Sequence, residues 1–378
     1  MDKVIMVLMM AYALMGAFDR IRGNRLGYGE AFEEGFRSMG TLALAIAAVY
    51  ASSPLLSEIL TPVASVFLEP FGIDRCVLPG LILSSDMGAY TLALSMTDNA
   101  ANAAFSGLIL GGTIGSTWIF TIPVALSIIR KEDLCYLSSG LLCGLVTMPA
   151  GIIAGGAVMH FTPYRMEFQE IVRCTFPVIV LSAIVGLGLW FRTDGTIRFF
   201  AFFGKIITAA VTALTAIAAF EEITGITFPV LDTLVKVDDA GLTGLDRGLV
   251  VCGQVSLVLS GAFPMVKFIT RHFSPVLSRF GTGVGVNTVA ASGFLSSAAN
   301  IIPMYSSYHD MDEKGRILNA AFAAAGAFVL GDHLGFTAGV NQSMVIPLIT
   351  AKLTAGISAV ILASFMSPLL IRRCSKTS

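Results

Sequence analysis

Leu330-Gly331-Asp332-His333-Leu334-Gly335-Phe336 lies inside an apolar, alanine-rich run and contains the residues that fit this run least well. A charged side chain at the centre of a membrane helix costs about 2.5–3.5 kcal/mol on insertion scales. Each glycine beside the Asp–His pair weakens a helix by roughly 1 kcal/mol relative to alanine. Either this segment is not in a membrane, or these residues have a function there.

The composition of the whole chain is that of a membrane protein. Of the 378 residues, 55% are hydrophobic and 13% are charged, with a mean hydropathy of +0.80. Soluble domains carry about 25% charged residues. Eight runs without Asp, Glu, Lys or Arg reach or approach the roughly 20 residues that cross a bilayer: 38–57, 99–129, 134–164, 174–191, 248–266, 280–308, 334–351 and 353–371. The alternating strands of an outer-membrane barrel do not occur, so we predict an all-α polytopic integral membrane protein.

The apolar runs predict about 10–13 helices, some of them re-entrant or broken. The expected long helices are about 4–18, 35–52, 103–129, 134–160, 173–191, 199–220, 248–266, 316–342 and 345–371. Two regions stay open. Region 54–97 fits two short crossings or an interfacial helix followed by a re-entrant hairpin, and region 280–308 is ambiguous in the same way.

The charged loops predict an orientation. In this helix order every basic cluster falls on one side, which the positive-inside rule makes cytoplasmic: Arg20/Arg22/Arg25, Arg130-Lys131, Lys267/Arg271/Arg279 and Arg372-Arg373. The acid-rich loop 221–246 then faces outward. We expect a multi-pass protein of the bacterial cytoplasmic (inner) membrane.

A weak internal repeat suggests two inverted halves, about 1–165 and 166–378, within a single transporter domain 1–378. The spacing of Gly35 and Gly40 recurs at Gly248 and Gly253, and Asp86 has Asn300 as its counterpart. Inverted repeats with broken elements near the midplane are typical of transporters, whose site lies at the repeat interface.

Two polar positions in the open regions are candidate binding residues. Asp86 is the only charge between Arg75 and Asp98, so it is expected to face a cavity and pair with a cation or a proton. Its alternative role is to cap a re-entrant turn. Asn300 can donate and accept hydrogen bonds, which suits a hydroxyl partner; its alternative role is to satisfy backbone freed by Pro303.

Asp332 and His333 are the strongest candidates. Adjacent helical positions point about 100° apart, so the two side chains need not contact each other. A helix break at Gly331 or Gly335 would expose backbone carbonyls that attract cations. Histidine also makes pH control plausible. The alternative is an Asp–His pair that joins neighbouring helices.

Other features favour structural roles. Gly107, Gly111 and Gly115 form a tandem GxxxG that predicts a close helix contact, whereas Tyr90 and Trp118 could supply a cation–π wall for a ligand. The remaining polar residues support no metal, cofactor or nucleic-acid site: His309, Asp310, Asp312 and Glu313 fit a loop that caps helix 316–342 better than a metal cluster. The six cysteines have no CxxC spacing and are expected to be reduced packing residues. No catalytic constellation is present, so an enzyme is not expected.

The chain resembles the ethanolamine-utilisation permease family, EutH. Seven segments carry the resemblance, in order along most of the chain: Phe32-Glu33-Glu34-Gly35-Phe36, Asp86-Met87-Gly88, Ser106-Gly107-Leu108-Ile109-Leu110-Gly111, Ile122-Pro123-Val124-Ala125-Leu126, Gly261-Ala262-Phe263-Pro264-Met265, Asn300-Ile301-Ile302-Pro303-Met304 and Gly331-Asp332-His333-Leu334-Gly335-Phe336. The resemblance implies uptake of ethanolamine through the bacterial inner membrane, feeding its catabolism.

Three functions fit these observations. The first is a transporter or facilitator for ethanolamine, in which Asp86 and Asp332 bind the ammonium, Asn300 binds the hydroxyl and His333 tunes the site or moves a proton. The others are a membrane sensor or scaffold that binds ethanolamine without transport, and a permease for another small cationic amine. The expected partners are ethanolamine and membrane lipid, with no nucleic acid. The oligomeric state stays open, a homodimer being one option.

Overall fold

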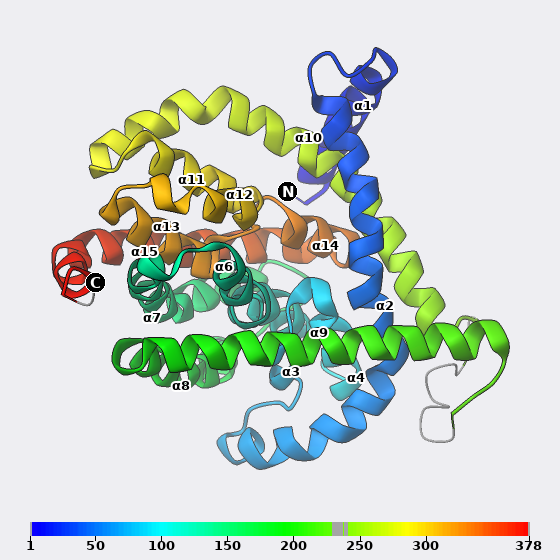
Figure 1. Ribbon diagram of the computed structural model, residues 1–378. Helices are drawn as coiled ribbons and strands as arrows, with labels where there is room; N and C mark the ends of the chain where they lie inside the picture. Colours follow the sequence, from blue (N-terminus) through cyan, green and yellow to red (C-terminus); the bar gives the residue numbers. More distant parts are fainter. Residues whose placement is uncertain (1, 229–236, 238–240, 377–378) are drawn as a thin grey trace.

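The protein is helical throughout the part of the chain that the structure describes (Figure 1). A computed structural model describes residues 2–228, 237 and 241–376, with the backbone alone at 273–282. Its main helices are α1 (Asp2–Ile21), α2 (Tyr28–Phe67), α3 (Val77–Ile82), α4 (Ala89–Met96), α5 (Ala100–Ala104), α6 (Ile122–Ile128), α7 (Leu134–Met159), α8 (Phe168–Phe191), α9 (Thr193–Thr224), α10 (Gly244–Val284), α11 (Thr288–Ala299), α12 (Ile301–Ser306), α13 (Glu313–Gly326), α14 (Asp332–Val340) and α15 (Val345–Cys374). The predicted all-α fold is confirmed.

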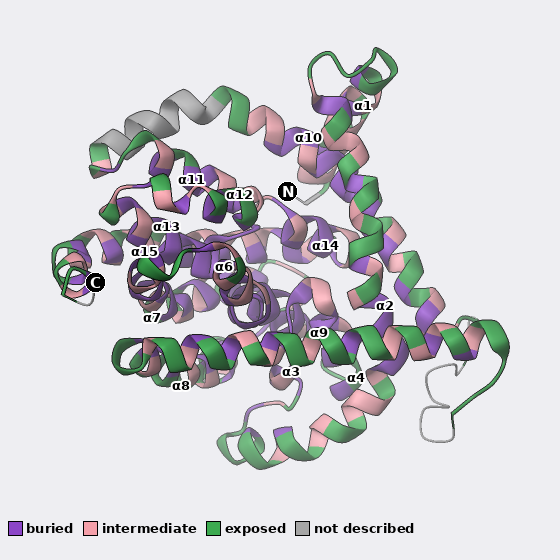
Figure 2. Ribbon diagram, viewed as in Figure 1, coloured by how far each residue is buried: buried purple, intermediate pink, exposed green. Residues whose placement is uncertain are grey.

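Eight helical stretches in the described residues are long and apolar enough to cross a membrane. They are Lys3–Ile21, Tyr28–Phe67, Ala100–Ile128, Lys131–Met159, Phe168–Phe191, Thr193–Thr224, Gly244–His272 and Gln342–Cys374. In Figure 2, exposed residues recur along the outer side of α9, and the buried residues gather on the central helices. Exposed apolar faces such as those of Phe199, Phe202 and Ile206 on α9 are expected where a helix contacts lipid. In the acid-rich loop 221–246, Asp232, Asp238 and Asp239 lie outside the residues that the structure describes.

The longest helices, α2 and α10, pack against each other through small residues. A Cβ on Gly35 would lie 2.3 Å from the backbone nitrogen of Ser260, and one on Gly248 would lie 2.5 Å from the Cα of Ala47. Helix interfaces in membranes are built this way because small residues let backbones approach closely. Gly35 and Gly248 are therefore needed where α2 and α10 meet.

The prediction that the second helix ends at residue 52 is wrong. Helix α2 continues through Pro54 and Pro62 to Phe67. Proline removes one backbone hydrogen bond and bends a helix, but membrane helices tolerate it because neighbouring groups satisfy the freed carbonyl. The open region 54–97 is thus the end of α2, a short connection and a helical segment, residues 77–96, that is broken in the middle.

We call residues 77–96 (α3 to α4) the first hairpin and residues 288–306 (α11 and α12) the second hairpin. Each contains a break with extended backbone. In the first, Leu83 and Ser84 are extended between α3 and the short 3-10 turn η2 (Ser85–Met87). In the second, Asn300 is extended between α11 and α12. A third break, Ala327–Gly331, separates α13 from α14, as the glycines at 331 and 335 led us to expect.

The chain between α5 and α6 is a π-helix over Phe105–Gly115 (η3) and Thr117–Thr121 (η4). The predicted close contact of its glycines is confirmed. A Cβ on Gly107 would lie 2.2 Å from the Cα of Tyr90, and one on Gly115 would lie 2.0 Å from the carbonyl oxygen of Leu83. π-helical turns often mark functional sites, and here they hold the first hairpin against the core.

The expectation that all six cysteines are reduced is wrong for one pair. Cys135, at the start of α7, forms a disulfide with Cys374, at the end of α15. The two positions are 239 residues apart in sequence but their Cα atoms are 5.5 Å apart, because α7 packs along α15. The other four, Cys76, Cys143, Cys174 and Cys252, are free and buried, as predicted.

Candidate functional site

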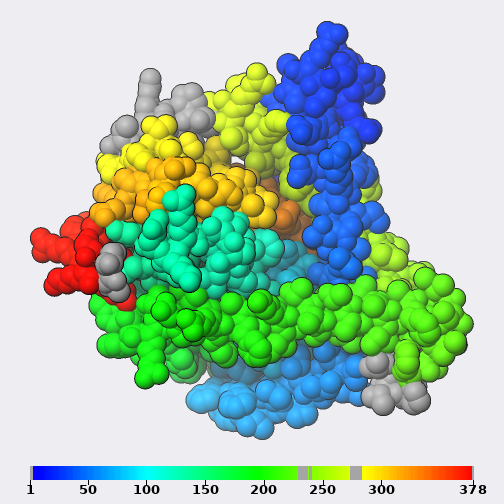
Figure 3. Space-filling model, in the orientation of Figure 1, coloured from blue at the N-terminus to red at the C-terminus, as the bar shows by residue number. Residues whose placement is uncertain are grey.

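A cavity of about 550 Å³ lies where the hairpin breaks approach α2. Its lining comes from α2, η2, η4, α9, α10, the second hairpin and α14. Figure 3 shows the surface hollowed between α2 (blue) and the second hairpin (gold), with α14 (orange) at the bottom of the recess. The lining includes three residues predicted from the sequence: Asp86, Asn300 and Asp332.

Asp86 is positioned by the break of the first hairpin. The Ser84 hydroxyl donates to its Oδ1, and His333 Nε2 lies 3.7 Å from the same oxygen. Gly88, with a φ of 90°, ends the turn in a left-handed conformation that L side chains rarely adopt, and Val49 of α2 fills the space beside it. The side chain of Asp86 keeps 20% of its surface exposed, on the cavity side.

Asp332 and His333 diverge from each other, as expected for neighbours at the start of a helix. Asp332 lines the cavity, and its carboxylate has no hydrogen bond or ion pair with any described residue. His333 is buried: its Nε2 lies 3.5 Å from the Ser84 hydroxyl, and its Nδ1 lies 3.0 Å from the Nζ of Lys352. An unpaired carboxylate and a buried imidazole thus point in different directions from the start of α14.

The break before α14 is stabilised by the second hairpin. The backbone N–H groups of Phe328 and Leu330 donate to the carbonyls of Ser297 and Ala298, at 2.9 and 2.8 Å. Phe328 has a φ of 59°, a strained value for a bulky residue, and strain of this kind is concentrated at functional sites. A Cβ on Gly331 would lie 2.0 Å from the carbonyl oxygen of Ala299, so only glycine fits.

Asn300 performs its alternative role and still faces the cavity. Its Oδ1 accepts the backbone N–H of Ile302 at 2.9 Å and so caps α12. Its Nδ2 has no hydrogen-bond partner among the described residues. The amide nitrogen can therefore donate to a ligand, whereas the amide oxygen already accepts a hydrogen bond from the backbone.

The two predicted aromatic residues lie away from the cavity lining. Tyr90 is buried on α4, and its hydroxyl accepts from the side-chain amide of Asn341 at 3.3 Å. Trp118 stacks on Phe200 of α9, with ring centroids 4.7 Å apart. The aromatic residues that do line the cavity are Phe120, which packs edge-on against Phe328, and Phe263 of α10.

Sequence reasoning missed two charged residues of this site, Glu34 and Lys352. Glu34 lines the cavity from α2 and has no partner among the described residues. Lys352 is 1% exposed and donates to the carbonyl oxygen of Gly112 in η3. A signal was available for Lys352, since it is the single charge between two charge-free runs, 334–351 and 353–371.

The charges around the cavity favour a cation. Asp86, Asp332 and Glu34 contribute carboxylates, and the only basic residue in its lining, Arg37, is engaged with Glu33 at 2.7 Å. Ionisable residues inside a membrane are rare and generally mark a substrate or ion pathway. The cavity can therefore stabilise a positive charge where lipid and apolar side chains could not.

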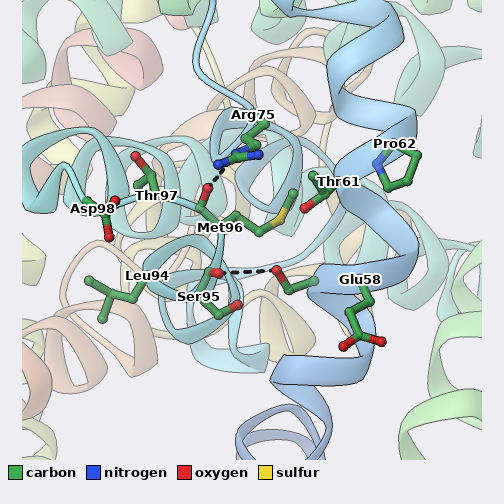
Figure 4. A pocket seen from close by; sticks show the side chains of 10 residues that line it. Glu58, Thr61, Pro62, Arg75, Leu94, Ser95, Met96, Thr97 and Asp98 are labelled. Carbon is green, nitrogen blue, oxygen red and sulfur yellow. Dashed lines mark hydrogen bonds between the residues drawn. The ribbon is translucent and has the colours of Figure 1, made fainter.

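A second cavity, of about 430 Å³, lies beside the bent end of α2 (Figure 4). Arg75 points into this region and donates to the carbonyl oxygen of Met96 at 2.9 Å. Glu58 and Asp98 also line it, while Ser57 donates to the carbonyl oxygen of Ser95 at 3.1 Å. The guanidinium makes this cavity less favourable for a cation than the first.

The loop before α13, which we expected to cap this helix, is held by hydrogen bonds and ion pairs within the chain. The Asp312 side chain accepts from the Gly315 N–H and so caps α13, as expected. His309 lies beside Asp133 at 2.9 Å, with Glu132 close by. Arg316 also donates to Asp133, so a guanidinium already supplies positive charge to this group.

A helical bundle with several membrane crossings, broken helices and carboxylates lining one cavity has the features of the integral membrane permeases. The chain belongs to the family of the ethanolamine utilisation protein EutH, which it matches over residues 1–366. It is a multi-pass protein of the bacterial cytoplasmic (inner) membrane.

Curated relatives match nearly the whole chain. A probable ethanolamine permease EutH of Listeria monocytogenes is 40% identical over 372 residues, covering 98% of this chain and 96% of the relative. The uncharacterized protein YxeR of Bacillus subtilis is 38% identical, covering 97% and 95%. The probable ethanolamine permease EutH of Salmonella typhimurium is 36% identical, covering 97% and 96%. No solved structure gives a significant match.

Proposed function

We propose that this protein takes up ethanolamine through the membrane and that the cavity between α2 and the two hairpins is its binding site. One observation carries the proposal: the cavity brings together Asp86, Asp332 and Asn300 from positions far apart in the sequence. The names of its relatives, probable ethanolamine permeases, support the same substrate.

Ethanolamine at neutral pH is a small ammonium ion with one hydroxyl. Its ammonium group can only donate hydrogen bonds and therefore needs acceptors. The unpaired carboxylate of Asp332 and the carboxylate oxygen of Asp86 that faces the cavity can accept them. Its hydroxyl oxygen can accept from the free Nδ2 of Asn300. The hydrogen bonds to the carboxylates replace the hydration that the cation loses on entering the cavity.

The two inverted halves provide the frame for transport in this proposal. The first half would supply Asp86, and the second half would supply Asn300 and Asp332. Motion of one half against the other around a fixed central site is how many transporters with repeats expose a ligand to each side in turn. In this proposal the protein carries its substrate unchanged, so no catalytic group is required.

The experiment is uptake of radiolabelled ethanolamine by proteoliposomes containing purified protein. We expect saturable uptake by the native chain. Asp86→Asn and Asp332→Asn should each weaken apparent affinity by about 10- to 100-fold, since hydrogen bonds to charged groups contribute about 1.5–3 kcal/mol. Glu58→Gln, which changes an acid in the second cavity, is the matched control and should transport normally.

The possible outcomes separate the functions that the sequence left open. Normal uptake by both Asp variants would overturn the site assignment. Binding of ethanolamine without flux would indicate a sensor or scaffold. Stronger uptake of another small amine, with choline and methylamine as competitors, would reassign the substrate.

A further inference from the structure

Lys352 is a buried cation that the binding of substrate does not use directly. It lies on α15, 1% exposed, and its Nζ contacts two acceptors from different elements: the carbonyl oxygen of Gly112 on η3 and the Nδ1 of His333 on α14. A buried charge is retained only where other groups compensate for its lost hydration. The second of these contacts leads toward the cavity through His333.

Lys352 in its ammonium form would determine which nitrogen of His333 carries a hydrogen. In its ammonium form, lysine has three donors and no acceptor, so the Nδ1 facing it must accept. A neutral ring that accepts at Nδ1 carries its hydrogen on Nε2. That nitrogen faces the Ser84 hydroxyl at 3.5 Å and the Oδ1 of Asp86 at 3.7 Å.

Four polar groups therefore form one line from the core to the cavity: Lys352, His333, Ser84 and Asp86. Each contacts the next, and only the last faces the cavity. The ring of His333 also packs on Phe328, with centroids 5.2 Å apart, so the strained break before α14 fixes its plane. The line joins α15, α14 and the first hairpin.

We propose that Lys352 is a positioning residue, which holds His333 neutral with its Nε2 hydrogen directed at Asp86, so that no second positive charge competes with the substrate ammonium there. This inference rests on the proposed function of the cavity. The charged groups that surround His333 are Lys352 on α15, Asp86 on η2, Asp332 on α14 and, across the cavity, Glu34 on α2. The element η3 contributes only the carbonyl of Gly112.

The consequence is a difference in pH dependence. With Lys352 in place, protonation of His333 should add no loss of apparent affinity for ethanolamine between pH 8 and pH 6. In Lys352→Met an apolar side chain of similar length leaves Nδ1 without a donor and removes the neighbouring positive charge, so the ring binds a proton more readily than in the native chain. The imidazolium would then compete for Asp86, so KM should rise about three- to tenfold on acidification to about pH 6.

The closing experiment is nitrogen NMR of ¹⁵N-histidine-labelled protein, combined with uptake at both pH values. The chain has four histidines, and His333→Gln assigns the signal of His333. In the native protein we expect the neutral Nε2–H form at both pH values, and in Lys352→Met a signal that titrates. In uptake, adding His333→Gln to Lys352→Met should return the pH dependence to that of the native chain.

The NMR result does not depend on ethanolamine, so it separates this inference from the proposed function. A native His333 that is protonated on Nδ1 at neutral pH would overturn the inference even if transport is normal, and needs no variant that might misfold. An unchanged histidine signal in folded Lys352→Met would overturn it as well. Absence of any native flux would instead overturn the proposed function.

Discussion

The two hairpins that border the cavity differ in what their breaks present to it. The first break, at Leu83–Gly88, presents a carboxylate, because Asp86 lies in the short turn and only Ser84 bonds it directly. The second break, at Asn300, presents an amide whose oxygen already caps α12. Related positions in the suggested repeat thus carry a charge in one half and a neutral donor in the other.

The long helices that follow the hairpins differ in the same way. After the first hairpin, the chain stays helical through the π-helices η3 and η4. After the second, it opens over Ala327–Gly331, and its free N–H groups are satisfied by the carbonyls of Ser297 and Ala298. The opening places Asp332 at the cavity. The comparison teaches that two similarly broken segments can present different groups to one cavity, which is what the proposed site for a cation with two different ends requires.

The largest expected effect comes from the glycines that let each break approach its neighbour. Gly115→Ala and Gly331→Ala would each place a Cβ 2.0 Å from a carbonyl oxygen, of Leu83 and Ala299 respectively. We expect each to destabilise the protein by about 1–3 kcal/mol or more, as overpacking does. Thermal unfolding in detergent measures this loss. Gly40→Ala, whose Cβ meets nothing within 4 Å, is the control; equal melting temperatures for all three variants would show that the breaks do not need close backbone contact.

An intermediate effect is expected at the amide of the second break. Asn300→Ala removes the free Nδ2 donor, so ethanolamine should bind about three- to tenfold more weakly, the value of one neutral hydrogen bond of about 0.5–1.5 kcal/mol. Because Asn300 also caps α12, binding of ethylamine, which lacks the hydroxyl, reports the structural part of the loss. Competition against labelled ethanolamine measures both ligands. Equal losses for both amines would mean that Asn300 does not recognise the hydroxyl.

The smallest effect is expected at the far end of the first hairpin. Asp74 accepts from the Cys76 N–H, the Thr97 hydroxyl and the Asn102 amide at 3.0, 2.8 and 3.2 Å. Burial alone would raise the pKa of Asp74, but these hydrogen bonds outweigh it and hold the pKa below its ordinary value. A carboxyl whose pKa is lowered by folding stabilises the fold at pH values above its unfolded-state pKa of about 3.9. This stabilisation is lost as the pH falls through the pKa of the folded state.

Asp74→Asn should therefore cost about 1 kcal/mol at neutral pH, and the difference from the native protein should shrink below about pH 4. Melting temperatures across this pH range measure it. Asp98→Asn, an acid on the same surface that makes no hydrogen bond with described residues, is the matched control. A difference that persists unchanged at low pH would show that the charge of Asp74 is not what stabilises the hairpin.

Much of this fold could be predicted because hydropathy is local. The charge-free runs identified nearly every long helix, and two costly residues beside glycines located the break before α14. The end of α2 was not predicted, since the helix continues through Pro54, where the Ser53 hydroxyl donates to the carbonyl oxygen of Tyr50 that the proline leaves free. The disulfide between Cys135 and Cys374 depends on α7 and α15 packing together, which no local pattern reports.

The site was only partly predictable for a related reason. An acid in an apolar run is conspicuous, so the sequence singles out Asp86 and Asp332 as candidates, and both line the same cavity. Tyr90 and Trp118 were chosen for their chemistry, but the direction of an aromatic ring depends on tertiary packing, and both face other helices. Lys352 was passed over because a single lysine between apolar runs resembles a helix boundary.

The most direct test of the account is a structure of the protein determined with ethanolamine bound, by cryo-electron microscopy. The account predicts density for one ligand in the cavity between α2 and the hairpins, with its ammonium nitrogen about 2.7–2.9 Å from a carboxylate oxygen of Asp86 or Asp332. Its hydroxyl should lie toward Asn300. A ligand bound instead beside Arg75, in the cavity at the bent end of α2, would contradict the account.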